Sequence, residues 1–183
     1  MRSLLVLITI LTLLFSSIGY GQATVYMTAD DFGKEDAEIY KEAILLKKSL
    51  ALTSEDGSAK VFNLKKDKIW GYRNNFGEDY RIKKSGSALR IIEYGEICIY
   101  SNLEEPASTL NPSIDSRWEN SPNALSKIHS FSIGATGKII KFSNGRFLKA
   151  LKGNAAYDKF LKLINSGSRE LLLKVVEHNA SVN

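Results

Sequence analysis

Few side chains of this 183-residue chain are of the types that perform catalysis or bind metals. Its two histidines, His129 and His178, are far apart, and its one cysteine, Cys98, lies in the aliphatic run "GEICIYS". A zinc site needs several convergent His, Cys or carboxylate ligands, and a nucleophilic triad needs a nucleophile, a histidine base and a carboxylate. Neither pattern is present, so we expect no metal, no cofactor and no catalytic residue, and we interpret Cys98 as a buried thiol.

Acidic side chains gather near the start of the chain. Asp30, Asp31, Glu35 and Asp36 lack the alternate spacing and central glycine of a calcium loop. The paired carboxylates of a sugar hydrolase leave no sequence signature. A small envelope hydrolase therefore stays an alternative, which two acids about 5 to 9 Å apart in a concave pocket would support.

Basic side chains gather near the other end. From Lys138 to Lys162 there are seven bases against Asp158 alone. Such a run is either a solvated face or a surface for an anionic partner, such as lipid head groups or envelope polysaccharide. Trp118, in the polar run "SRWEN", either anchors its loop or contacts a partner. No nucleic-acid motif is present. The candidate anion-binding residues are Arg146, Lys149, Lys152, Lys159 and Lys162.

The first 21 residues have the layout of a secretory signal peptide. Arg2 precedes an apolar run from Leu4 to Phe15, and Gly19 and Gly21 give the small-x-small pattern before a cleavage site. The run is shorter than the roughly 20 residues that span a bilayer, although an uncleaved anchor is the alternative. We predict cleavage after Gly21, a single domain over 22–183 without a transmembrane segment, and a periplasmic or secreted location.

The elements that must position these side chains are mostly strands. Residues 24–27 predict a short strand, whereas residues 33–58 fit a helix or loop that becomes a strand near Leu50. From about 59 to 142, short β-branched and aromatic runs separated by turns predict an antiparallel meander of five to seven strands, with consecutive strands as neighbours. A long loop at 101–126 holds all three prolines, and "HSFSIGATGKIIKFS" predicts a hairpin.

Apolar residues then take helical spacing from about 145 to 180. This predicts two or three helices, with Asn154 and Ser168 as N-caps. The expected apolar stripes are Tyr157, Leu161 and Ile164 in one helix and Leu172, Val175 and Val176 in the next. A meander followed by helices is an α+β domain.

The stretch "KIWGYRNNFGEDYRI", residues 68–82, predicts a core hairpin. "NNFG" suits a hairpin loop, and the strand periodicity places Trp70 with Tyr72 on one face, so that cross-strand aromatic pairs form. Gly71 would let a neighbouring ring pack across the strand. An exposed aromatic platform for sugars or peptides would use the same residue types.

This stretch resembles a family of small uncharacterised exported proteins of Gram-negative bacteria. The family opens with Tyr-x-Thr-x-x-Asp-Phe, which Tyr26, Thr28, Asp31 and Phe32 match, and the run "EYGEICIYS" is similar to its next strand pair. A charged stretch follows Phe32 where a proline is expected. The family implies no activity. "WGYRNNFGEDYRI" is also similar to one unit of the tryptophan-glycine repeat proteins, but such arrays need several copies, and "FSIGATGKIIKF" is at best a degraded one.

Together these patterns predict an exported, non-enzymatic binding or scaffolding domain of the cell envelope. Its partner would be an anionic envelope component or another envelope protein. Besides the hydrolase, a second alternative is a partner-binding module that uses the last helix. An exposed apolar stripe around Leu172 and Val176 would support that alternative.

Overall fold

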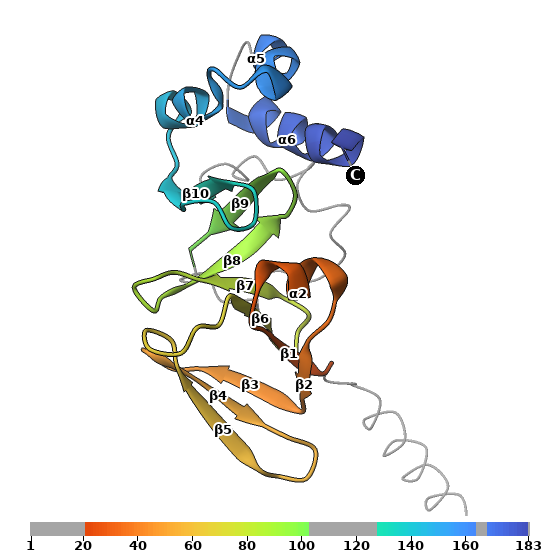
Figure 1. Ribbon diagram of the computed structural model, residues 1–183, viewed down its shortest axis with the longest axis vertical. Helices are drawn as coiled ribbons and strands as arrows, with labels where there is room; N and C mark the ends of the chain where they lie inside the picture. Colours follow the sequence, from red (N-terminus) through yellow and green to blue (C-terminus); the bar gives the residue numbers. More distant parts are fainter. Residues whose placement is uncertain (1–20, 103–127, 164–167, 183) are drawn as a thin grey trace, which may run out of the picture.

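The computed structural model describes residues 21–102, 128–163 and 168–182 (Figure 1). Nearly all of the predicted signal peptide, most of the predicted loop at 101–126 and Trp118 lie outside these residues. The helices α4, α5 and α6 lie at one end of the molecule, a small sheet lies at the other end, and a larger sheet runs between them (Figure 1). The predicted α+β class is confirmed.

The larger sheet has eight described strands, all paired antiparallel, in the order β11-β10-β9-β8-β7-β6-β1-β2. From β6 to β11 the order follows the sequence, as a meander requires. Its strands are β1 Ala23–Tyr26, β2 Glu38–Tyr40, β6 Gly71–Arg73, β7 Asp79–Ile82, β8 Ala88–Glu93, β9 Ile97–Ser101, β10 Ile128–Ile133 and β11 Ile140–Lys141.

The smaller sheet has the order β3-β4-β5, formed by Glu42–Leu45, Ser49–Thr53 and Ala59–Asn63. The helix or loop expected before Leu50 is therefore wrong, because residues 38–45 form strands. The expectation that consecutive strands are neighbours is also wrong at one place. After β5 the chain folds back on itself, where Asp67 N donates a 2.8 Å hydrogen bond to Asn63 O, and then enters the larger sheet as β6.

Three hairpins share one turn geometry. In the first, Ser54 N donates to Ser58 O and Gly57 N donates to Ser54 O, and the turns at 74–78 and 83–87 repeat this pattern. The glycines at their fourth positions have φ of 82°, 74° and 83°, which side chains rarely adopt. These repeated turns set the register of the three hairpins.

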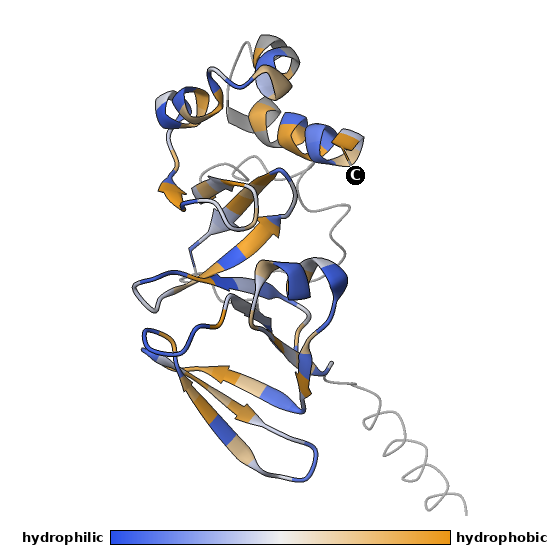
Figure 2. Ribbon diagram, viewed as in Figure 1, coloured by the Kyte–Doolittle hydropathy of each residue, from blue (hydrophilic) through white to orange (hydrophobic). Residues whose placement is uncertain are grey.

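The two larger cores lie on one face of the larger sheet. Register places Ile82 opposite Ala88 and Ile99 opposite Phe131, all on this face. At the β6–β7 end the face packs against the smaller sheet, and at the β9–β10 end it packs against the helices. In Figure 2 hydrophobic residues appear on the smaller sheet, on β8 and β9 of the larger sheet and on the C-terminal helices.

The C-terminal helices pack through apolar residues spaced about one turn apart. They are α4 Asn144–Leu151, α5 Asp158–Leu163, which follows a short 3-10 turn η2 at Ala155–Tyr157, and α6 Ser168–Val182. Asn154 caps η2, because its side chain accepts from Ala156 N at 3.1 Å. In α6 the buried residues are Leu171, Val175 and Asn179. Of the predicted stripe, Val175 is buried and Val176 is exposed, and the side chain of Leu172 lies outside what the structure describes. None of the described helices is both long and apolar enough to cross a bilayer.

Candidate functional site

The predicted core hairpin is confirmed. Tyr72 in β6 lies directly opposite Tyr80 in β7, and their rings stack with centroids 4.8 Å apart and an interplanar angle of 13°. Both rings are buried against the smaller sheet. The turn between the strands is closed by the hydrogen bond from Asn74 N to Glu78 O at 2.9 Å. This pair is therefore part of the core and not a platform for a ligand.

Trp70 does not share the face of Tyr72, contrary to the sequence prediction. Its ring lies against Phe32 of α2 (Ala29–Lys34), with centroids 5.0 Å apart, and 6.3 Å from Tyr94. Gly71 is required for a reason that the sequence did not indicate. A Cβ at this position would lie 2.3 Å from the carbonyl oxygen of Tyr80, so the glycine is needed because a backbone group approaches closely.

The two motifs of the family resemblance meet at Trp70. Thr28 and Asp31 form a capping box at the start of α2, in which Thr28 N donates to Asp31 Oδ2 at 2.7 Å and Asp31 N donates to Thr28 Oγ1 at 3.1 Å. The Thr28 hydrogen bonds lower the pKa of Asp31. The cap fixes α2 so that Phe32 reaches Tyr26 and Trp70. Asp31 thus has a structural role at the start of α2.

A buried arginine lies on the other side of Trp70. Arg81 is 7% exposed, and its guanidinium lies 5.8 Å from the Trp70 ring and 5.6 Å from the Tyr100 ring. Its Nη1 donates to Tyr100 OH at 2.6 Å and to Ser132 Oγ at 3.0 Å. In the part of the chain that the structure describes, no carboxylate forms an ion pair with it. A buried cation of this kind depends on its hydrogen bonds and ring contacts.

The same cluster holds the β10–β11 turn, in which three carbonyl groups accept side-chain hydrogen bonds. Ser132 Oγ donates to Gly134 O at 2.9 Å, and Trp70 Nε1 donates to Ala135 O at 3.1 Å. Arg81 Nη2 donates to Gly137 O at 2.8 Å. We call Trp70, Arg81 and Ser132 the turn clamp.

The turn leads directly into the basic segment. Lys138 and Lys141 are exposed, and α4 follows with Arg146 and Lys149 exposed along it and Lys152 exposed at its C-cap. None of these five side chains forms an ion pair with a carboxylate of the described chain. We call these five residues the basic surface. The predicted residues Lys159 and Lys162 lie in α5, but their side chains, like Trp118, are outside what the structure describes.

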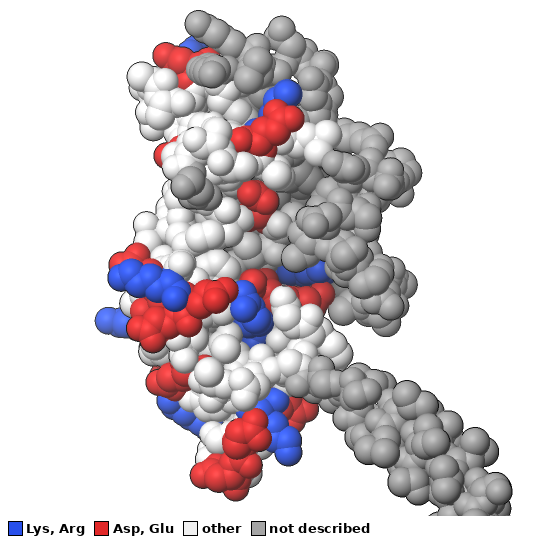
Figure 3. All heavy atoms as spheres, turned by 90° about the vertical axis from the view of Figure 1, so that its right-hand side faces the viewer, with Lys and Arg blue, Asp and Glu red and all other residues white. Residues whose placement is uncertain are grey.

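Other parts of the surface carry charges of both signs. On the face shown in Figure 3, acidic and basic side chains lie next to one another over the lower half of the molecule. Several of the cations outside the basic surface are paired, as Lys60 is with Glu38 at 3.0 Å and Arg90 with Glu78 at 3.2 Å. The basic surface differs from these regions because the segment that carries it has few acidic residues in its sequence.

Cys98 and His178 both make contacts within the fold that account for their positions. Burial raises the pKa of the Cys98 thiol, whose Sγ donates to Gly95 O at 3.4 Å. His178 Nε2 lies 3.1 Å from Glu96 Oε2, and the His178 ring packs on Tyr157 and Phe160. The His178 side chain is therefore mostly buried. Among the described residues, no group of three or more His, Cys, Asp or Glu side chains could hold a metal ion.

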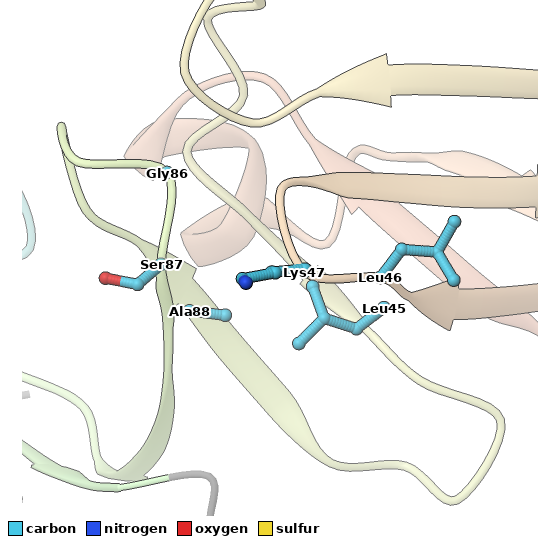
Figure 4. Close-up of a pocket in the computed structure, with 6 residues that line it drawn as sticks. All are labelled: Leu45, Leu46, Lys47, Gly86, Ser87 and Ala88. Carbon is cyan, nitrogen blue, oxygen red and sulfur yellow. The ribbon is translucent and has the colours of Figure 1, made fainter.

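A shallow pocket of about 260 Å³ lies between the two sheets (Figure 4). It is bounded by the β3–β4 turn and the β7–β8 turn, and Lys47 and Ser87 supply its polar side chains. Leu45, Leu46 and Ala88 make it largely apolar. This pocket has no carboxylate in its lining, so it does not supply the acid pair that a hydrolase needs.

Comparisons of the chain with protein-family models, with curated proteins and with solved structures found no match.

Proposed function

We propose that this chain is an exported, non-enzymatic binding domain of the cell envelope that contacts an anionic component through its basic surface. One observation carries the proposal: five exposed cations follow one another on the β10–β11 turn, β11 and α4, and none is paired with a described carboxylate. A run of exposed like charges without paired acids attracts anionic partners.

The turn clamp supports the proposal. A loop tip with small residues is ordinarily mobile, but here Trp70 and Arg81 hold the carbonyl groups that precede Lys138. Binding then requires less ordering of the basic turn, and the entropic cost of association is lower.

Export is supported by the sequence of residues 1–21. Arg2, the following apolar run and the Gly19–Gly21 pattern are typical of a cleaved signal peptide. N-terminal sequencing of the protein recovered from the envelope or the medium is expected to begin at Gln22. An intact Met1 on that protein would show an anchor instead.

The binding proposal is tested by chromatography on an immobilised polyanion, dextran sulfate, with a salt gradient. The variant R146E/K149E/K152E should elute at clearly lower salt than the unchanged protein. The control variant K65E/K66E/K68E makes the same change in net charge at three exposed lysines beyond β5, and it should elute close to the unchanged protein. Equal shifts for the two variants would show that only net charge matters, and the proposal would fall.

A second candidate, a partner-binding module that uses α6, is favoured by two exposed side chains. Leu173 and Val176 are 38% and 41% exposed and lie three residues apart, on one side of the helix. If this side is an interface, L173E/V176E should abolish co-purification of a specific envelope protein after crosslinking. The same partner recovered with the variant would exclude α6 as its contact.

A further inference from the structure

We infer that the anionic component is a phospholipid surface, on which α4 lies with its axis parallel to the membrane plane. This inference rests on the proposed function. It concerns the outward side of α4, and it depends on how the helix is seated on the domain.

The inward side of α4 is fixed by two fully buried residues. Phe147 and Leu151 are one turn apart and both 0% exposed, and Phe147 packs on Phe131 of β10 with centroids 5.0 Å apart. A helix seated by residues i and i+4 lies along the surface of the domain and does not point away from it. Its opposite side is therefore presented over the whole helix length.

The outward side of α4 is cationic. With 100° between successive residues, Lys149 lies opposite the Phe147–Leu151 side, and Arg146 and Lys152 flank it. Gly145 lies beside Lys149, and a Cβ there would meet nothing within 4 Å. The helix contains no acidic residue. The helix itself therefore offers no acidic side chain that would repel a flat anionic surface.

The exposed side chain of Leu148 favours a phospholipid surface over a polysaccharide as the anionic partner. Leu148 is 39% exposed on the flank of the helix, next to Lys149 and one turn before Lys152. A hydrated polysaccharide offers an exposed leucine little apolar contact. The head-group boundary of a phospholipid bilayer takes up apolar side chains and binds lysine and arginine together. The combination of cations with Leu148 therefore favours a lipid surface.

The test is sedimentation of the mature protein with vesicles, at low salt. Vesicles of phosphatidylcholine with about a third phosphatidylglycerol should bind it, and pure phosphatidylcholine vesicles should not. Each cation near an anionic surface raises affinity roughly fivefold, so R146E/K149E/K152E should lower the affinity by at least about 100-fold. Adding 0.5 M salt should release the protein, because its charges are then screened over a few ångströms.

The leucine contribution is tested with a matched pair. L148Q should weaken vesicle binding about threefold while leaving elution from dextran sulfate unchanged. L173Q makes the same substitution at equal exposure on α6 and should change neither. If L148Q and L173Q bind vesicles equally well, the role of Leu148 in lipid contact is wrong.

Two outcomes separate the inference from the proposal on which it rests. Retention on dextran sulfate without binding to anionic vesicles would overturn the lipid surface and point to a polysaccharide or an acidic protein, with the proposed function intact. If the protein binds neither dextran sulfate nor anionic vesicles, both the inference and the proposed function fall.

Discussion

Arg81 and Gly137 are 56 residues apart in the chain, yet the guanidinium of Arg81 donates a 2.8 Å hydrogen bond to the carbonyl oxygen of Gly137. Arg81 belongs to the Trp-Gly-Tyr hairpin, and Gly137 immediately precedes Lys138, the first residue of the basic surface. The hairpin motif thus has a structural task beyond its own core: it holds the turn that leads into the proposed binding segment.

Replacing Arg81 by lysine keeps the charge but loses the planar fork of donors. Tyr100, Ser132 and Gly137 cannot all be reached by one ammonium group, so we expect R81K to lower the free energy of unfolding by about 2–3 kcal/mol. Urea unfolding measures this change. In R90K, a control at a partly exposed arginine that pairs with Glu78, the loss should stay below about 1 kcal/mol. An R81K protein as stable as R90K would mean that the clamp contributes little.

Gly137 cannot carry a side chain in this fold. A Cβ at this position would lie 1.9 Å from the carbonyl oxygen of Ile133, so G137A must open the turn and should cost at least about 2 kcal/mol. The matched change G145A, at a glycine of α4 with open space around it, should be neutral or stabilise by up to about 1 kcal/mol. Thermal unfolding of the two variants distinguishes them, and equal melting temperatures would contradict the close approach of Gly137 to the end of β10.

Asn179 fastens α6 to the β8–β9 turn. Its side chain is 2% exposed, accepts from Ile97 N at 3.1 Å, and donates to Ile97 O and Glu93 Oε1, both at 2.9 Å. N179A leaves these buried groups without partners and should cost about 2–3 kcal/mol. Hydrogen exchange should also become faster at the Ile97 amide. S181A, an exposed change two residues later, should stay within about 0.5 kcal/mol; slow exchange at Ile97 in N179A would count against the contact.

Three buried tyrosines make stability depend on alkaline pH. Burial raises the pKa of Tyr72, Tyr80 and Tyr100 above the ordinary value of 10.0. Below pH 10 these tyrosines are protonated in the folded and unfolded states, and their contribution to stability is fully present. Above pH 10 the unfolded state loses protons first, so stability falls by about 1.4 kcal/mol per pH unit for each tyrosine.

The variant Y72F isolates one of these groups. No hydrogen bond joins the Tyr72 hydroxyl to a described residue, so Y72F should match the unchanged protein at pH 7 within about 0.5 kcal/mol. Above pH 10 its stability should fall less steeply, as urea midpoints between pH 8 and 12 would reveal. Identical slopes for the two proteins would show that Tyr72 ionises normally in the folded state.

The parts of the fold that the sequence predicted are those with a single strong local signal. Tyr72 and Tyr80 pair because alternation and a glycine turn act together. The strands at 38–45 were missed because Ile39, Ala43 and Leu46 fit a helical face, whereas in the structure Ile39 and Leu46 are exposed and Tyr40 is the buried residue. Tertiary pairing with β1 and β4 overrides the local pattern there.

The turn clamp could not be read from the sequence in the same way. An arginine within a strand is ordinarily assigned to solvent, and the acceptors of Arg81 come from β9, β10 and the β10–β11 turn. One signal was present: Arg81 stands between the hydrophobic residues Tyr80 and Ile82. Their strand lies in the interior of the sheet, where both of its faces are buried. Lys138 and the α4 cations were found by charge alone, because exposed charge runs are visible in sequence.

The central claim, that the basic surface holds this protein on an anionic partner, is tested most directly by fractionating its native host and washing the envelope with low and then high salt. The unchanged protein should remain with the envelope at low salt and be released at high salt, because exposed charges are screened within about 10 Å at 0.1 M salt. R146E/K149E/K152E should already be free at low salt, while K65E/K66E/K68E should behave like the unchanged protein. Recovery of the unchanged protein entirely in the soluble periplasm or the medium at low salt would contradict the claim.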